Sequence, residues 1–349
     1  MGVRKKALIA LCMVVTFAIL AACGSNNADN GPSGSPATGS PAGTAAAPDL
    51  SGKLVIYTGS GTEITDPLLA GFKKQYPDVK IEIVKAGSGE LLARIAAEQS
   101  NPGGDVLLGG QPYSFESNKD RFEPYESPND KEMIREDSNH IWHVWSFMPQ
   151  AIMVNTKLLK DESAWPKSIK DLADPKWQGG KIALADPGKS GTGAAIVNGI
   201  VTLYDWDFMT QLLKNVEVLS GSDAMFAAVK DGSVPVGFIN EDLGAKWEQT
   251  GLPVKMIYPS DGVTNVMDSL AIIKGAKNMD NAKAFVDYMG SKEAQEILRD
   301  DVLRRSTRKD VTPPEGLSDL SQFNMVDAKM MSSDEIGNNF NERLEQARR

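Results

Sequence analysis

Short apolar runs alternate with amphipathic stretches along the chain from residue 50 onward. Several of the runs alternate apolar and polar residues with a period of two, as half-buried β-strands do, and the stretches between them repeat with the helical period. In the first group, strands are expected at 53–57, 79–85 and 105–108, and helices at about 65–76 and after 87–89. This strand–helix–strand order predicts a parallel sheet with right-handed crossovers.

A second group of elements begins near residue 151. We expect a strand at 151–155 to cross into a second lobe and a strand at 269–273 to return to the first. The pattern also predicts strands at 181–184 and 234–239, and helices at 193–201, from 241, at 281–290, 292–299 and 333–348. The predicted fold class is therefore α/β, a two-lobed clam-shell of two mostly parallel sheets flanked by helices, with two crossing strands as the hinge. Lobe 1 is expected at 50–150 and 267–349, and lobe 2 at 151–266.

The first 49 residues have a different pattern. Arg4, Lys5 and Lys6 precede an apolar run at 7–20, which ends in two small residues and Cys23. This arrangement predicts a lipoprotein signal peptide at 1–22, cleaved so that the thiol of Cys23 carries diacylglycerol. Residues 23–49 are rich in Gly, Ser, Asn, Ala and Pro, which predicts a flexible linker. The protein is expected to be exported and anchored on the extracytoplasmic face of the cell membrane.

Composition excludes several classes of function. The chain has a formal net charge of −9 and no cluster of basic residues, so nucleic acid is not an expected partner. Once Cys12 leaves with the signal peptide and Cys23 is lipidated, no thiol remains for a disulfide, an iron–sulfur centre or a nucleophile. Only His140 and His143 are present, which excludes a histidine-rich metal site. No cofactor and no resident metal are expected.

Three loops share one construction, in which a strand is followed by Gly, Ser and Thr residues and then by a helix. They occupy 58–63, 87–90 and 188–193. Such loops present backbone N–H groups and hydroxyls at a helix N-terminus, where the partial positive charge favours anions. Open α/β sheets also bind ligands at the carboxyl ends of their strands. The candidate ligand-binding residues are Ser60, Gly61, Thr62, Ser88, Gly89, Gly110, Ser190, Gly191 and Thr192. The alternative is that Ser and Thr only cap the helices.

Asn240, Glu241 and Asp242 follow the predicted strand at 234–239. Two carboxylates and an amide at the end of a strand suit ligand hydroxyls or an ammonium group. The alternative is that Asn240 or Asp242 caps the next helix. Asp268 and Ser269, at the return crossing, are weaker cleft candidates. A further set of residues is expected near the hinge, either in the core or lining the cleft: His140, Trp142, His143 and Trp145.

Residues 54–308 resemble the solute-binding proteins of ABC importers, in the ferric-iron-binding-type branch of the type 2 periplasmic-binding fold. The motifs that carry the resemblance are LVIYTG (54–59), FKKQYPDVK (72–80), GSGELLARI (87–95), MVNTKLL (153–159) and ADPGKSGTG (185–193). The resemblance implies a monomer that captures a small solute between its lobes and delivers it to an ABC permease in the bilayer. It implies binding without catalysis.

The chain departs from the iron-binding members of that family, which usually carry adjacent tyrosines near the strand end that here contains Asn240. No two tyrosines are adjacent in this chain. The pattern instead resembles branches that bind phosphorylated sugars or phosphonates. In those branches, Ser60, Thr62, Ser88 and the loop at 190–192 would hold phosphoryl oxygens, and Asn240, Glu241 and Asp242 would hold hydroxyls or an amine.

Two other functions stay open as alternatives. A ferric-ion binder could use Glu241, Asp242 and a synergistic anion, although carboxylates alone make a thin ligand set for iron. An exported hydrolase is less favoured, because Ser190 lacks both the final glycine of a nucleophile elbow and an evident base. The sequence therefore predicts a binding protein for a small, anionic, phosphorylated or phosphonate-type solute.

Overall fold

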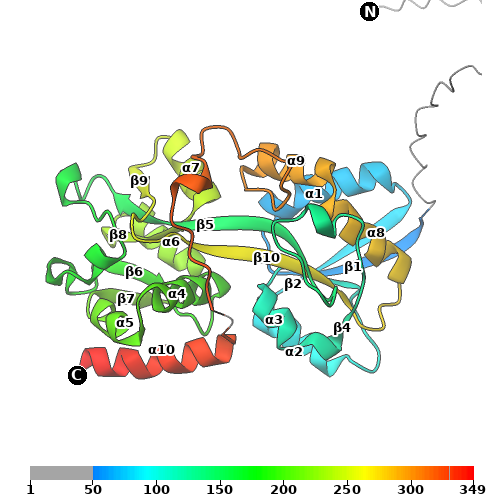
Figure 1. The fold of residues 1–349 in the computed structure, drawn as a ribbon, viewed down its shortest axis with the longest axis horizontal. Helices are drawn as coiled ribbons and strands as arrows, with labels where there is room; N and C mark the ends of the chain where they lie inside the picture. Colours follow the sequence, from blue (N-terminus) through cyan, green and yellow to red (C-terminus); the bar gives the residue numbers. More distant parts are fainter. Residues whose placement is uncertain (1–49, 330) are drawn as a thin grey trace, which may run out of the picture. The chain divides into compact units, whose positions relative to one another are not determined.

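Two long antiparallel strands, β5 (His143–Asn155) and β10 (Thr264–Ile273), run through the centre of the described part of the chain, residues 50–329 and 331–349 of this computed structural model. The predicted signal peptide, Cys23 and the whole predicted linker lie outside the described residues. All of β5 is buried, and it pairs with β10 from Thr264 to Leu270. The predicted pair of crossing strands is therefore confirmed (Figure 1).

The strands form one ten-stranded sheet with the order β2-β1-β3-β10-β5-β8-β6-β7, in which β4 also pairs with β10 and β9 with β5. Strands β1, β2 and β3 are parallel in the first lobe, and β6, β7 and β8 are parallel in the second. The bounds are β1 Gly52–Thr58, β2 Val79–Lys85, β3 Val106–Leu108, β4 Phe122–Glu123, β6 Ile182–Ala185, β7 Val216–Leu219, β8 Val236–Asn240 and β9 Val254–Ile257. The predicted α/β clam-shell with a mostly parallel sheet in each lobe is confirmed.

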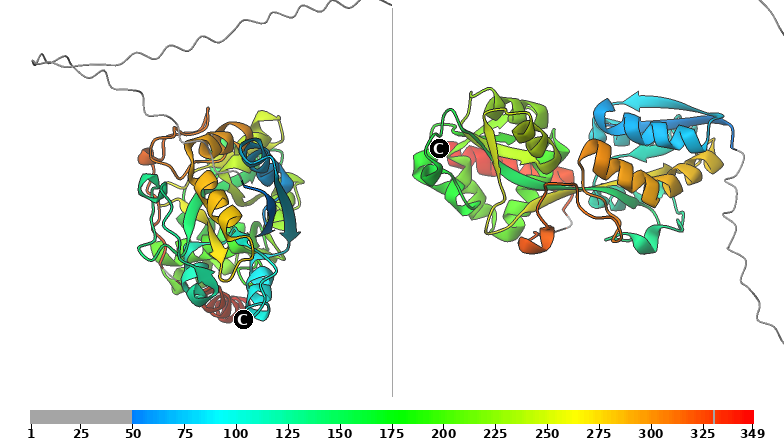
Figure 2. Two further views of the ribbon diagram at one scale, coloured as in Figure 1. Left: turned by 90° about the vertical axis from the view of Figure 1, so that its right-hand side faces the viewer. Right: turned by 90° about the horizontal axis from the view of Figure 1, so that it is seen from above.

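Helices cover the sheet in both lobes (Figure 2). Those of the first lobe are α1 Thr62–Gln75, α2 Ser88–Ala97, α3 Pro112–Glu116, α8 Met279–Gly290 and α9 Lys292–Val302. Those of the second are α4 Gly191–Leu203, α5 Trp206–Leu213, α6 Ser222–Lys230, α7 Glu241–Gln249 and α10 Ser333–Arg348. Short 3-10 segments occupy Lys119–Arg121, Asp130–Glu132, Glu162–Ala164, Lys170–Ala173, Pro175–Trp177 and Leu320–Gln322. Among the described residues, none of the helices has the length and apolar character needed to span a bilayer.

Each lobe has its own apolar core, built from the helical and strand periodicity of the sequence. In the first lobe, Leu68 and Phe72 are four positions apart on α1, so both face inward and pack with Phe285 of α8. Trp145 is fully buried in the same core. His143 is buried at the start of β5, so this part of the hinge region is interior.

The last helix packs differently from the expectation. Residues 267–349 were all predicted to belong to lobe 1, but α10 contacts α4 and α5 of lobe 2. Ile336 and Phe340, four positions apart on α10, are both buried in the core of lobe 2. The predicted bounds of this helix agree with the structure, but its apolar stripe alone could not indicate which lobe it covers.

Candidate functional site

The parallel strands of lobe 1 bring its predicted ligand loops together. The Ala86 N–H donates to the Thr58 carbonyl oxygen at 3.3 Å, which joins the chain after β2 to the end of β1. A Cβ on Gly59 would lie 3.1 Å from the Ala86 oxygen and 3.9 Å from the Ser88 nitrogen. The residues at the N-caps of α1 and α2, Gly61 and Gly87, provide no side-chain cap. Ser60 and Ser88 are thus in adjacent loops beside two helix N-termini without side-chain caps.

One side chain already lies at the first of these helix ends. The carboxylate of Glu63, in the first turn of α1, folds back against Gly61. It therefore occupies the position at which the partial positive charge of the helix favours an anion. Thr62 is exposed at the same end. A bound anion at this loop would have to displace the Glu63 carboxylate or share the site with it.

The loop after β3 depends on two glycines. Gly109 and Gly110 have φ angles of 115° and 103°, in the region that side-chain-bearing residues rarely adopt. The Gly109 N–H donates to the Ser269 oxygen at 2.9 Å, and the Ser269 N–H donates to the Gly110 oxygen at 2.8 Å. These bonds fasten the loop to β10 and point the next residue, Gln111, towards lobe 2.

Gln111 joins the two lobes directly. Its Nε2 donates to the Gly191 oxygen at 3.2 Å. In the loop that begins α4, Ser190 is buried and its Oγ accepts from the Gly193 N–H at 3.0 Å, so it is a helix N-cap. A Cβ on Gly193 would lie 2.5 Å from the Ala185 oxygen, so only glycine fits there. Thr192 is half-buried in the first turn. The lobe 2 loop therefore meets the lobe 1 loop at the cleft.

The two acidic residues predicted to bind ligand are both paired with arginines of the same chain. Glu241 accepts from Arg305 Nε at 2.5 Å and from its Nη2 at 2.9 Å, and it also accepts from the Tyr258 hydroxyl. Asp242 Oδ2 accepts from Arg304 Nε and Nη2 at 2.9 and 2.7 Å. All four charged side chains are buried. Glu241 and Asp242 therefore tie lobe 2 to the segment after α9, and their main interactions are internal. Of the three predicted residues here, Asn240 is half-buried and its Oδ1 finds no partner among the described residues.

The weaker candidate, Asp268, lies beside this cluster. Burial, together with the negative charge of Asp242, raises the pKa of Asp268 to about 6. The Arg304 guanidinium, whose Nη1 is 3.9 Å from Asp268 Oδ2, acts in the opposite direction, as do the Gly110 N–H and the Ser146 hydroxyl. Burial and the carboxylate of Glu241 likewise raise the pKa of Tyr258. The hinge thus contains a cluster of three acids and two arginines, in which Asp268 is half-buried and the other four side chains are buried.

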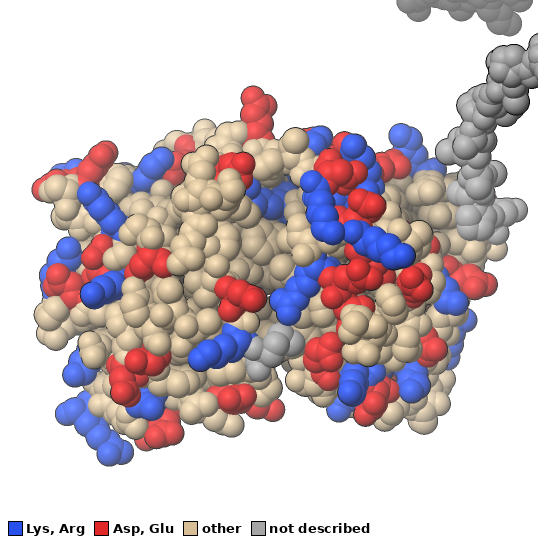
Figure 3. Space-filling model, in the orientation of Figure 1, with Lys and Arg blue, Asp and Glu red and all other residues tan. Residues whose placement is uncertain are grey.

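A cavity of about 190 Å³ lies at the junction of the lobes. Figure 3 shows this face of the molecule hollowed between the lobes, with acidic and basic side chains around the hollow. The lining residues come from lobe 1, the hinge strands, α4 and the segment before α10: Gln111, Pro112, Tyr113, Arg135, Phe147, Asn198, Asn265, Met267, Met325, Val326, Asp327, Ala328 and Lys329. None of the predicted ligand residues is among them, although Gln111 directly follows Gly110.

Sequence reasoning missed Arg135, Asn198, Asn265 and Lys329. One signal was available for Asn198, which is a carboxamide in the otherwise largely apolar helix GTGAAIVNGIVTL. An amide in such a helix needs a buried hydrogen-bond partner. The other three residues are in stretches of mixed polarity, which give no comparable signal.

Comparisons with known proteins agree with this architecture. Residues 105–331 match the family of bacterial extracellular solute-binding proteins. An uncharacterized protein of Haemophilus influenzae is 32% identical over 263 residues, which cover 70% of this chain and 75% of that protein. A protein of Sinorhizobium fredii named "Probable ABC transporter periplasmic-binding protein y4fP" is 28% identical over 262 residues, which cover 71% of this chain and 72% of that protein.

A solved structure is similar over most of the chain. It is the periplasmic binding protein AfuA from Actinobacillus pleuropneumoniae with exogenous fructose 6-phosphate bound. The TM-score is 0.74 at 27% sequence identity, and the match covers 85% of this chain and 98% of AfuA.

Proposed function

The chain belongs to the bacterial extracellular solute-binding proteins, and on this basis we propose that it captures a small organic anion with a phosphoryl or phosphonyl group between its lobes. In this proposal it delivers the solute to the permease of an ABC importer and carries out no chemistry on it. The proposal includes a lipid anchor at Cys23, a location on the extracytoplasmic face of the cell membrane, and a monomeric protein.

The hydrogen bond between Gln111 and Gly191 is the observation that carries the proposal. It brings a glycine-rich loop of lobe 1 into contact with the first turn of α4 in lobe 2. A ligand that touches both loops stabilises the closed arrangement, which is how a hinged two-lobed protein couples binding to a change of shape.

An anionic ligand group is favoured by the helix ends beside the predicted ligand loops. The N-cap of α2 provides no side-chain hydrogen bond, so the backbone N–H groups of its first turn remain for a phosphoryl group, and at α1 a phosphoryl group would displace the Glu63 carboxylate. Ser60, Ser88 and Thr192 would add hydroxyl donors. The similar protein AfuA was solved with a sugar phosphate, which supports the same ligand class here.

The ferric-ion alternative is less well supported. The iron ligands predicted for it, Glu241 and Asp242, are both paired with buried arginines. Both oxygens of Glu241 are bound by Arg305, so metal binding there would have to break that pair, and breaking a buried pair typically costs about 3–5 kcal/mol. The internal pairing therefore favours an organic anion over iron.

A thermal-shift screen of the purified protein tests the ligand class. The panel contains fructose 6-phosphate, glycerol 3-phosphate, 2-aminoethylphosphonate and ferric citrate. A ligand at about 100 times its dissociation constant adds about 2.7 kcal/mol to the free energy of unfolding. We expect at least one phosphorylated or phosphonate compound to raise the melting temperature. A rise with ferric citrate alone would replace the proposal with the iron alternative.

A further inference from the structure

The chain passes between the lobes a third time, after α9. Figures 1 and 2 show this orange-to-red segment leading from α9 in lobe 1 to α10 on lobe 2. We call its last part, residues 324–329, the strap. The strap runs beside the start of β10, because the Val263 N–H donates to the Asn324 oxygen at 2.8 Å and the Val326 N–H donates to the Val263 oxygen at 3.0 Å. Five consecutive strap residues, 325–329, line the cavity.

The strap holds two amide side chains of the cavity wall. Asn265 Nδ2 donates to the Val326 oxygen at 3.0 Å, and Asn198 Nδ2 donates to the Lys329 oxygen at 2.7 Å. The strap is itself fastened to α4, because the Lys329 N–H donates to Thr202 Oγ1 at 3.1 Å. With its NH₂ group bound to the strap, the Asn198 amide has a fixed orientation.

This orientation leaves one acceptor without a partner. Asn198 is only 2% exposed, and its Oδ1 finds no hydrogen-bond partner among the described residues. Asn198 is also one of the residues that line the cavity. A buried acceptor without a partner is unfavourable until a donor reaches it, so the site discriminates in favour of ligands that supply one.

We propose that the strap completes the ligand site and that Asn198 Oδ1 accepts a hydrogen bond from a hydroxyl of the ligand. This inference rests on the proposed function and narrows its ligand class to hydroxylated phosphates, such as sugar phosphates. In this assignment, Asn198 touches the ligand, and Thr202 is a positioning residue that acts through Lys329.

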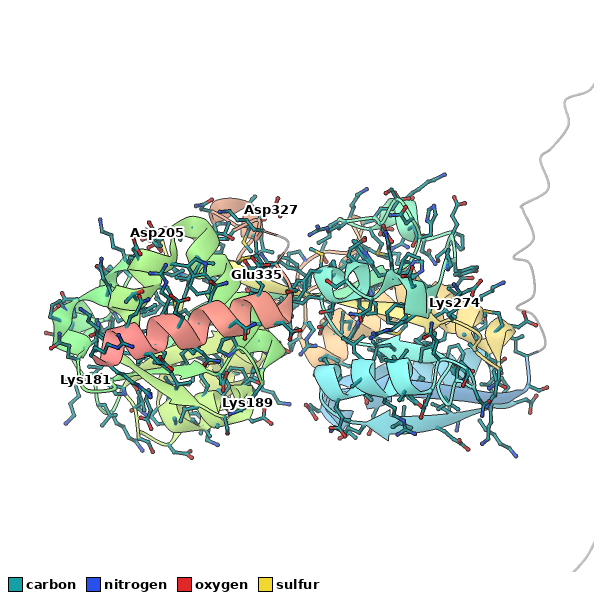
Figure 4. The ribbon with its side chains drawn as sticks, turned by 90° about the horizontal axis from the view of Figure 1, so that it is seen from below. Lys181, Lys189, Asp205, Lys274, Asp327 and Glu335 are labelled. Atoms are coloured by element: carbon teal, nitrogen blue, oxygen red, sulfur yellow. The ribbon has the colours of Figure 1, made fainter. Side chains whose placement is uncertain are left out.

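The cavity is lined by charged side chains of both signs. Arg135 and Lys329 are cationic and Asp327 is anionic, so the charged lining residues sum to +1. Figure 4 shows Asp327 beside the boundary between the lobes. The volume of about 190 Å³ is below the roughly 300–1,000 Å³ of drug-sized sites and suits a small solute.

Calorimetric titration with two probes tests the inference. Fructose 6-phosphate offers hydroxyl donors, and ethyl phosphate has the phosphoryl group without them. The variants are Asn198→Ala and Thr202→Val, and the control is Thr250→Val, an exposed threonine of lobe 2 whose hydroxyl bonds only within its own helix turn. We expect Asn198→Ala to weaken binding of fructose 6-phosphate about tenfold and to change binding of ethyl phosphate less than about twofold. Thr202→Val should reduce the preference for fructose 6-phosphate over ethyl phosphate by a smaller factor, and Thr250→Val should not change this preference.

The outcomes separate this inference from the proposed function. Equal affinity changes for both probes, or no change in either variant, would overturn the role of Asn198 and the strap while the proposed function stands. Wild-type protein that binds neither probe but binds 2-aminoethylphosphonate would overturn the hydroxyl assignment alone. Wild-type protein that binds no phosphorylated or phosphonate compound would overturn both. If Asn198→Ala does not fold, Thr202→Val decides the strap's role.

Discussion

Gln111 Nε2 donates a 3.2 Å hydrogen bond to the backbone oxygen of Gly191, and this bond joins the β3–α3 loop of lobe 1 to the first turn of α4 in lobe 2. The acceptor belongs to a loop that is rigid on its own account, because Ser190 caps α4 and Gly193 packs against Ala185. The donor is placed by the two glycines before it, which have positive φ angles. This hydrogen bond can therefore form only when the two lobes lie close together.

Replacing this donor should open the unliganded protein. A hydrogen bond contributes a net of about 0.5–1.5 kcal/mol, so Gln111→Ala should shift the population towards open forms by roughly two- to tenfold. Small-angle X-ray scattering of the unliganded protein should show a larger radius of gyration. Gln178→Ala, at an exposed glutamine outside the cavity lining, is the control. Identical scattering from wild type and Gln111→Ala would show that the bond does not hold the lobes together.

The arginine pairs at the hinge should contribute strongly to stability. Arg305→Met leaves the buried Glu241 carboxylate without its cation, and breaking a buried pair in this way typically costs about 3–5 kcal/mol. The matched control is Lys255→Met, which removes the partner of Glu248 in an exposed pair and should cost less than about 1 kcal/mol. Urea unfolding of both variants measures the difference. Similar small losses in both would mean that the buried pair is not needed for stability.

Asp268 should make stability depend on pH. Its pKa is raised from 3.8 to about 6 by burial and by Asp242, so between these values the folded protein binds more protons than the unfolded chain. The stabilising contribution of the protonated form is complete below about pH 4 and is lost as the pH rises to about 6, a difference of roughly 3 kcal/mol. Asp268→Asn removes this titration.

The measurement is the free energy of unfolding of wild type and Asp268→Asn at several pH values from 4 to 7. The variant should gain stability relative to wild type as the pH rises through this window. The gain should level off above about pH 6. A constant difference between the two proteins at all pH values would contradict the raised pKa of Asp268.

Two substitutions in the loop at the start of α4 should distinguish helix capping from ligand binding. Ser190→Ala removes the N-cap of α4 and should lower the free energy of unfolding without ligand by about 1 kcal/mol. Thr192→Val should leave that stability nearly unchanged and weaken binding of fructose 6-phosphate. Unfolding and calorimetric titration of each variant measure the two effects. If Thr192→Val binds as tightly as wild type, the threonine hydroxyl does not contact the ligand.

Much of the fold could be predicted because its periodicity is clear. The alternation of apolar and polar residues at Val79–Lys85 correctly predicted where β2 begins and ends. The predicted bounds of α10 also agree with the structure. The first half of β5 was not predicted, because β5 is buried on both faces and contains Ser146, Pro149 and Gln150, so its polar and apolar residues do not alternate. The elements α3, α5, α6, β4, β7 and β9 were not predicted either.

The candidate site was harder to predict, because its contacts join residues far apart in the chain. Glu241 and Asp242 have a composition that suits a ligand site, but their partners, Arg304 and Arg305, come more than 60 residues later. No local pattern indicates such a pairing. The strap also could not be predicted as part of the site. It lies along the cavity because α10 packs on lobe 2, so the segment before α10 has to cross the junction of the lobes.

The most direct test of a phosphoryl-specific solute-binding protein is calorimetric titration of the purified protein with fructose 6-phosphate and, separately, with fructose. The two probes share the same sugar, and only fructose 6-phosphate carries the phosphoryl group. The account predicts saturable binding of one equivalent of fructose 6-phosphate, with fructose bound at least about a hundredfold more weakly, since charge-assisted hydrogen bonds to the phosphoryl group are lost. Equal affinity for the two sugars would contradict it.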